Sequence, residues 1–315
     1  AELEDSYEPG DPRLQATIMY PWETLPDGSG RVVFLNPQMQ NNRYNQKVVV
    51  PLADPPGSGN TGVNIRRIRY AHVLLTAAEA AARSNQEAQA RTWLNMVRAR
   101  ARGSRSVTLG VYPELLASSI ATLLGRPAAA SRVFVRFVDP DDQAYAAGLR
   151  SFTSECISSC PGNPQAPVPN PPVLVTNIDI IEAVDGVPVT TLAEYEAQVN
   201  AKAPGAPVTL TVTRIQQSAS GPTTTTPVTA VVTAQALLPA VTSSGQQLLN
   251  DIWRERRHEL AMEQHRWFDL VRQGSQRAQQ ALQAHGKTFQ VGKHELFPIP
   301  ANEVTVSGLQ QNPNY

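Results

Sequence analysis

The sequence predicts a mainly α-helical protein, built on helical hairpins with long loops, that carries a small inserted α+β domain. Two observations lead to this fold class. Apolar and small residues recur at helical spacing over 64–83, 86–102 and 243–274, which indicates helices with a buried face. Over 208–213, valine and leucine alternate with threonine, and 228–233 repeats the pattern; this period of two is typical of half-buried strands.

Composition limits the classes of partner. The chain has 315 residues, enough for a sizeable core and about two domains. Its 27 lysines and arginines equal its 27 aspartates and glutamates. A nucleic-acid partner is not expected, because phosphate binding needs a basic excess. The first residues show no signal-peptide pattern, so we expect either a fragment or a product from which an upstream part was removed.

The first third of the chain changes from turns to helices. Glycine and proline turn signals dominate residues 1–62, with one short strand expected at 48–52. Helices are predicted over 64–83 and 86–102, with only Ser84–Asn85 between them. A break this short favours an antiparallel helical hairpin.

The middle of the chain is predicted to contain short strands and one helix. Thr191 and Glu194 have the spacing of a capping box, in which side chain and backbone satisfy each other's unpaired groups at a helix start. A third helical region follows from Ser243 to Gly274, as one long helix or as two with a bend near Gln264. The strand candidates are 133–138, 178–184, 208–213 and 228–233.

The third helical region contains an arginine-rich stretch at 254–270, "RERRHELAMEQHRWFDL". Aromatic residues are interleaved with its arginines, and a guanidinium can bind buried carbonyls while stacking on a ring. A structural arginine network that holds helices against loops is therefore favoured over a ligand site. The two cysteines, Cys156 and Cys160, are either unrelated small residues or a local disulfide pair.

Several segments resemble a known family in the family's own order. The most specific are "RERRHELAMEQHRWFDLVRQG" at 254–274 and "LFPIPANEVTVSGLQQNPNY" at 296–315, preceded by "DPRLQATI" at 11–18 and "IRRIRYAHVLLTAAEAAA" at 65–82. With these segments the chain resembles the C-terminal region of the SusD/RagB family of outer-membrane nutrient-binding proteins. The resemblance implies a TPR-like helical core assembled from 1–103 and 238–315.

The same resemblance implies a function. Family members are surface lipoproteins that deliver glycans or peptides to a SusC-like, TonB-dependent transporter. The expected partners are therefore this transporter, the ligand, and the N-terminal half of a SusD-like protein, which is expected to carry the lipid anchor. The expected location is the cell surface of the outer membrane.

Residues 104–237 resemble a PDZ domain, through "VFVRFVDPDDQAYAAGL" at 133–149 and "IDIIEAVDGVPVTTLAEYEAQV" at 178–199. This implies an inserted PDZ-like β-barrel that is either a peptide-binding domain or a spacer. The alternative function is then a protein-interaction scaffold in which the insert binds a peptide C-terminus or a partner protein, with no affinity for small ligands. The peptide-binding loop would contain Ser131, Arg132, Val133 and Phe134.

The candidate ligand residues in the first segment are Tyr20, Trp22, Arg43 and Tyr44. Sugars stack on aromatic rings with polar groups beside them. Trp22 lies among turn-forming residues without the periodic context of a core position, and a packing role for it remains equally open. The sequence lacks the nucleophile motif Gly-x-Ser-x-Gly and any His-x-x-x-His pair, so no enzyme, cofactor or metal is expected.

Overall fold

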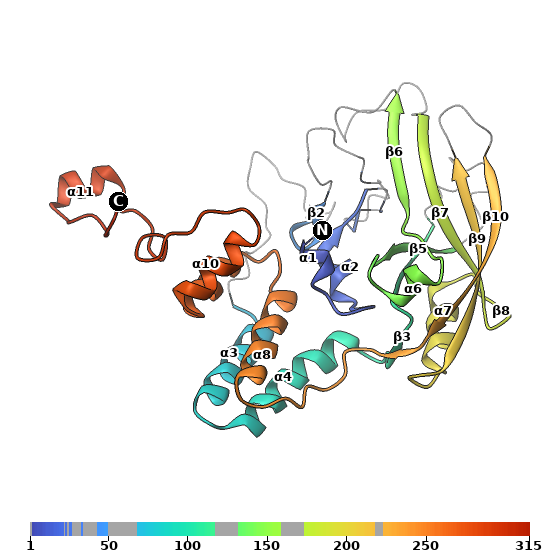
Figure 1. Ribbon diagram of the computed structural model, residues 1–315, viewed down its shortest axis with the longest axis horizontal. Coiled ribbons are helices and arrows are strands. Elements are labelled where there is room, and N and C mark those ends of the chain that lie inside the picture. The colour runs from blue at the N-terminus through green and yellow to red at the C-terminus, as the bar shows by residue number, and fades with distance from the viewer. Residues whose placement is uncertain are drawn as a thin grey trace. The chain divides into compact units, whose positions relative to one another are not determined.

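The computed structural model divides into two compact units, Ala1–Glu259 and Leu260–Tyr315 (Figure 1). Among the described residues, no helix is long and apolar enough to span a membrane. The structure describes residues 2–21, 23, 25–26, 33, 43–49, 68–116, 132–158, 173–217 and 223–315, with the backbone alone at 154–158 and 173–175.

Three helices of the first unit share one apolar core. α3 (Tyr70–Arg83), α4 (Glu87–Arg102) and α8 (Gly245–Glu259) contact one another. α3 and α4 form the predicted hairpin, and Asn85 turns the chain between them with φ of 60°. Residues 64–67 of the first predicted helix lie outside the described part. The shared core contains Leu75, Ala78, Leu94, Val97, Leu248 and Ile252.

The third helical region forms two helices. After α8 the chain leaves helical geometry, and α9 begins at Arg266 and ends at Arg272. Met262 and Gln264 lie between them with φ of 64° and 66°, in the left-handed region that interrupts a helix. The bend predicted near Gln264 is therefore a break. The second unit also contains α10 (Ser275–Gln283) and α11 (Ala301–Ser307), and Leu270, Ala278 and Phe289 form its core.

The largest assembly is a seven-stranded antiparallel sheet in the strand order β10–β9–β7–β5–β4, with β6 and β8 also pairing with β7. Helix α7 (Leu192–Asn200) packs on it and begins with the predicted Thr191–Glu194 capping box. A short helix, α6 (Gln143–Ala146), contacts β10. The strands are β4 Val111–Leu115, β5 Val133–Val138, β6 Thr153–Ser158, β7 Val173–Val184, β8 Val187–Pro188, β9 Pro207–Gln217 and β10 Thr224–Thr233.

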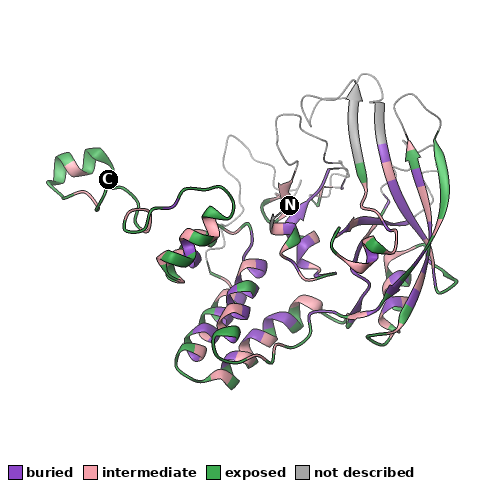
Figure 2. Ribbon diagram, viewed as in Figure 1, coloured by how far each residue is buried: buried purple, intermediate pink, exposed green. Residues whose placement is uncertain are grey.

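Alternation along the strands builds the sheet core, as predicted. In β9, Leu210 and Val212 are buried and Thr211 between them is exposed; Leu210 pairs with Ala230 of β10. Figure 2 shows the same change between buried and exposed residues along β9 and β10. The threonine side chains face solvent on one side of the sheet, and the aliphatic side chains are buried on the other side. This arrangement favours strand formation.

Short elements surround the N-terminus. α1 (Glu2–Asp5) and α2 (Arg13–Thr17) lead into β1 (Ile18–Met19), which pairs with β2 (Tyr44–Asn45). A 3₁₀ turn, η1 (Gln46–Val48), follows β2, so Val48 is not in the strand predicted at 48–52, and 50–52 lie outside the described part. β3 (Val107–Thr108) pairs with β11 (Gln235–Ala236) where the chain enters and leaves the sheet region.

The predicted fold class, mainly α with a TPR-like helical core, is wrong. In the described part of the first unit, three helices form one cluster, whereas seven strands form a single sheet. Three of these strands are long: β7, β9 and β10 span 12, 11 and 10 residues. The fold is therefore mixed α and β.

The sheet also does not support the predicted PDZ-like β-barrel. β4 and β10 stand at the two ends of the strand order, and they do not pair with each other within the described residues. The sheet is thus open there, and a barrel needs closure. The predicted domain boundaries, 103/104 and 237/238, stay a prediction. The division into two units falls after Glu259, at another point of the chain, and does not test them.

Candidate functional site

Three of the four predicted ligand residues lie together beside the β1–β2 pair. Met19 of β1 is opposite Tyr44 of β2, so Tyr20, which follows β1, and Arg43, which precedes β2, are neighbours. Trp22, the fourth, lies outside the described residues. The short antiparallel pair therefore brings together residues that are more than twenty positions apart in the sequence.

Arg43 covers the ring of Tyr20. The guanidinium carbon of Arg43 lies 4.5 Å from the centroid of that ring, and its Nε donates to Oε1 of Glu4 at 2.5 Å. Tyr20 is only 5% exposed and also contacts the ring of Phe137, whereas Arg43 and Tyr44 are half-buried. The ring of Tyr20 thus packs against the guanidinium of Arg43. Arg43 and Tyr44 form the accessible surface, which we call the β2 surface.

A buried guanidinium between two carboxylates adjoins this surface. Arg136 of β5 pairs with Glu114 at 2.5 Å, lies 3.6 Å from Glu23, and donates to the carbonyl of Pro21 at 3.1 Å. Glu23 accepts a hydrogen bond from the backbone N–H of Tyr20 at 3.0 Å. Burial, and then the nearby carboxylate of Glu114, raise the pKa of Glu23 to about 8. At neutral pH Glu23 is therefore mostly protonated, and Arg136 and Glu114 balance each other.

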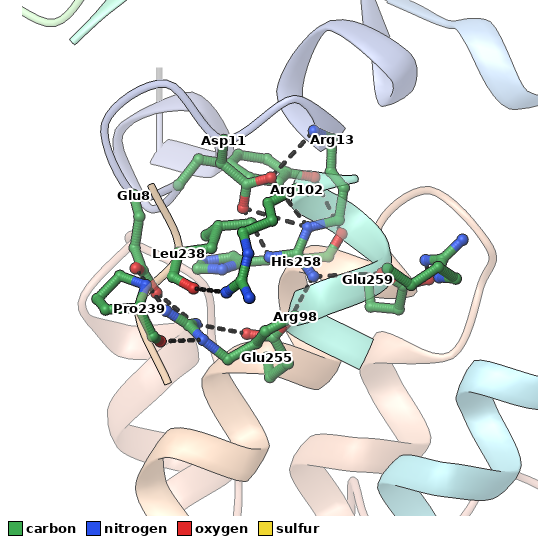
Figure 3. A network of polar contacts seen from close by, with 12 residues as sticks. Glu8, Asp11, Arg13, Arg98, Arg102, Leu238, Pro239, Glu255, His258 and Glu259 are labelled. Carbon is green, nitrogen blue, oxygen red and sulfur yellow. Dashed lines mark hydrogen bonds and ion pairs between the residues drawn. The ribbon is translucent and has the colours of Figure 1, made fainter. Parts of the chain in front are cut away.

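The N-terminal segment is fixed to the helices by the ion-pair network of Figure 3. Arg13 of α2 contacts Asp11 at 2.7 Å and Glu255 of α8 at 2.5 Å. Arg98 of α4 contacts the other oxygen of Glu255 at 2.9 Å and Glu8 at 2.7 Å. Glu255 thus bridges two arginines while being 1% exposed, so each charge has a partner and the cost of burying it is offset.

Glu259 is the second centre of this network and joins it to β2. Its carboxylate contacts Arg13 at 3.2 Å and Arg69 at 2.5 Å, and also pairs with Arg100. Burial opposes ionisation of Glu259, but the bound arginines outweigh it and lower its pKa. Its backbone carbonyl accepts from Nζ of Lys47, in the turn after β2, at 3.0 Å. The turn that follows the β2 surface is therefore tied to the end of α8.

A buried ion-pair network does hold the helices against the N-terminal segment, but its arginines, Arg13, Arg69, Arg98 and Arg100, lie outside the predicted arginine-rich stretch. Within the predicted stretch, Arg256 is buried and donates to Oγ1 of Thr76 at 3.0 Å. The residues of this stretch that bind the arginines of the network are its carboxylates, Glu255 and Glu259. The sequence patterns did not predict this role. A signal existed: with Leu248 and Ile252 they continue one helical stripe that faces the core.

The remaining predicted residues lie in or beside the sheet. Val133 and Phe134 are fully buried in β5, which has β4 on one edge and β7 on the other, and Arg132 pairs with Glu182 at 3.1 Å. Ser131 lies outside the described residues, so assignment of this loop to peptide binding stays a prediction. So does the disulfide, because Cys156 lies in β6 but Cys160 is not described. In the described part, no group of three histidine, cysteine or acidic residues is placed to hold a metal.

The comparisons with known proteins identify a family. A model of the SusD family matches residues 2–109 and 196–315. A search of curated proteins found no match. The ion-pair network joins the two matched segments, since Arg13 and Arg98 lie in the first and Glu255 and Glu259 in the second.

Proposed function

Because the chain belongs to the SusD family, we propose that it binds glycans on its β2 surface and passes them to a SusC-like, TonB-dependent transporter. Membership of the family implies surface nutrient binding in glycan uptake, and its members are lipoproteins associated with the outer membrane. The proposed role is binding without catalysis.

The observation that carries the proposal is the pairing of a half-buried ring with a fixed guanidinium. Tyr44 offers an aromatic face next to Arg43, whose orientation is held by Glu4 and by the ring of Tyr20. A sugar presents an apolar face of C–H groups together with hydroxyls, so it can stack on a ring and accept hydrogen bonds at once. Because Arg43 is held in place, less side-chain freedom is lost on binding.

Charge balance favours a neutral ligand. Arg43 pairs with Glu4, and Arg136 pairs with Glu114. A peptide carboxylate would have to compete with these carboxylates, whereas a neutral sugar would not. We therefore propose glycans over peptides as the ligand class.

Titration calorimetry of the full chain with a panel of neutral oligosaccharides tests the binding. Tyr44→Ala should weaken binding of the best ligand about tenfold, which corresponds to roughly 1.4 kcal/mol, and Tyr44→Phe should retain most of it because the ring remains. Tyr70→Ala is the matched control, since Tyr70 is an exposed tyrosine, 69% accessible, on α3. Equal affinity in the Tyr44→Ala and Tyr70→Ala variants would refute the site.

The transporter partner needs a separate test. A tagged form of the protein, purified from solubilised outer membranes of its own host, should co-elute with a TonB-dependent barrel protein. Purification without any such barrel would refute the transporter part of the proposal and leave glycan binding standing.

A further inference from the structure

A buried carboxyl closes the turn that carries Tyr20. The backbone N–H of Glu23 donates to the carbonyl of Tyr20 at 3.3 Å, and the Glu23 side chain accepts from the backbone N–H of Tyr20 at 3.0 Å. Both residues are buried. The backbone at Tyr20 is therefore held by Glu23, and the ring of Tyr20 is the surface on which Arg43 packs.

This carboxyl shares one guanidinium with a second acid. Nε of Arg136 pairs with Glu114 at 2.5 Å, while Oε1 of Glu23 lies 3.6 Å from the same nitrogen, which is beyond hydrogen-bond range. Nη1 of Arg136 donates to the carbonyl of Pro21 at 3.1 Å. Its Nη2 is buried and has no hydrogen-bond partner in the described part of the chain. A buried donor is thus left over, and Glu23 lies beside this guanidinium.

Aromatic rings hold the guanidinium of Arg136 in place. Its central carbon lies 5.0 Å from the ring centroids of both Phe134 and Phe152, and these two rings make an edge contact with centroids 5.6 Å apart. Arg136 is buried, whereas the side chain of Glu114 is 26% exposed. If Glu23 ionises, Glu114 can turn toward water, and Arg136 can bind Glu23 with little movement.

The charged groups that face Glu23 come from three places in the described chain. Burial and the carboxylate of Glu114 of β4 raise the pKa of Glu23, whereas Arg136 of β5 and Arg43, which precedes β2, lower that pKa. Because Arg43 favours the ionised carboxyl, the ionised carboxyl attracts Arg43 in return. Glu4 of α1 accepts from Nε of Arg43 at 2.5 Å, so Glu4 and an ionised Glu23 compete for one guanidinium.

We propose that Glu23 is a proton-operated positioning residue of the β2 surface. While Glu23 is neutral, Arg43 stays between Glu4 and the ring of Tyr20, in the position where a ligand would meet it. Loss of the proton to water draws Arg43 toward Glu23, so glycan binding weakens as pH rises. This regulation rests on the proposed binding of glycans at the same surface.

A ligand-free NMR titration of the full chain tests the proton step. The ring resonances of Tyr20, assigned by their absence in Tyr20→Phe, should shift as Glu23 ionises, around its pKa of about 8. The Tyr20 phenol does not titrate in this range, because burial raises its pKa. Glu23→Gln keeps an acceptor for the Tyr20 N–H and cannot ionise, so it should abolish the shift.

Two further variants separate proton sensing from a purely structural role. Glu114→Gln removes the carboxylate that opposes ionisation of Glu23, so it should lower the midpoint of the titration by about one pH unit. Glu182→Gln is the matched control, because Glu182 pairs with Arg132 in the same sheet region, and it should leave the midpoint unchanged. A Tyr20 signal that does not titrate, or that titrates alike in the wild type and in Glu23→Gln, would overturn the proposal.

Calorimetry at pH 6.5 and pH 9, with the neutral oligosaccharide that binds best, measures the effect on affinity. The wild type should bind at least about fivefold more weakly at pH 9, whereas Glu23→Gln should bind with similar affinity at both. Equal wild-type affinity at the two pH values would overturn the regulation and leave the binding site standing. Absence of binding at both would overturn glycan regulation together with the proposed function, and the Tyr20 titration would then support or overturn the movement of Arg43 by itself.

Discussion

The imidazole of His258 stacks on the ring of Tyr7, with ring centroids 4.8 Å apart and ring planes 24° apart. The Tyr7 hydroxyl donates to the backbone carbonyl of His258 at 3.1 Å. Both ring nitrogens of His258 are buried without a hydrogen-bond partner among the described residues. Burial, and then the charge of Arg13, lower the pKa of His258 to about 3. The network of Figure 3 therefore encloses a neutral imidazole among its arginines.

Replacing this imidazole should change how stability depends on pH. An unfolded histidine binds a proton below a pKa of 6.5, and His258 in the folded protein does so only near 3. Its contribution to stability is thus complete above pH 6.5 and is lost as pH falls toward 3. His258→Phe keeps the stacked ring and forfeits no hydrogen bond. It should match or exceed the wild type at pH 7.5, with an advantage that grows on acidification, as measured by urea unfolding.

The control for this experiment is Tyr7→Phe. It removes the hydrogen bond to the His258 carbonyl and should cost about 1 kcal/mol at every pH, because the imidazole still titrates. Parallel pH profiles for the wild type and His258→Phe would show that His258 is not a source of the acid sensitivity.

Removing Arg98 should be far more costly than removing a surface arginine. Arg98→Met leaves Glu255 buried with one partner lost, and breaking a buried pair in this way costs about 3–5 kcal/mol. Arg254→Met is the control, because Arg254 pairs with Asp251 on the same helix and its side chain is 51% exposed; it should cost at most about 1 kcal/mol. Chemical denaturation measures both, and similar losses would contradict the structural role of the network.

Glu23 should make stability depend on pH in the opposite direction to His258. Its pKa is raised from 4.5 to about 8 in the folded protein, so the folded state holds a proton that the unfolded state releases between these values. Stability from this group therefore falls as pH rises through that window. Glu23→Gln keeps an acceptor for the Tyr20 N–H and cannot ionise. The variant should gain relative to the wild type between pH 5 and 8 in thermal melts, and a constant difference would argue against a protonated Glu23.

Local sequence patterns predicted the helices and strands that interactions between nearby residues determine. The 3.6-residue period predicted α3 and α4, the Thr191–Glu194 spacing predicted the start of α7, and the alternation over 208–213 predicted the middle of β9. The extent of the sheet was underestimated because strand length depends on pairing. β7 is 12 residues long since β9, β6, β5 and β8 all pair with it, and such long-range contacts leave little trace in the sequence.

The grouping of the candidate ligand residues also depends on long-range pairing, and their ligand role stays a prediction. Aromatic and polar residues in an irregular segment indicated Tyr20, Arg43 and Tyr44, and β1–β2 pairing does bring them together. The stacking of Arg43 on Tyr20 depends on that pairing, which the sequence does not reveal. The sequence does not reveal the shared partner of Glu255 and Glu259, because Arg13 is 242 and 246 positions away.

The central claim, glycan binding at the β2 surface, is tested most directly by amide hydrogen exchange with and without the oligosaccharide that binds best by calorimetry. We expect slower exchange on binding in peptides that cover Arg43–Val49, and Tyr44→Ala should raise the ligand concentration needed for this protection about tenfold. Protection that leaves 43–49 unchanged, in the presence of saturating ligand, would contradict the claim and place the glycan elsewhere on the protein.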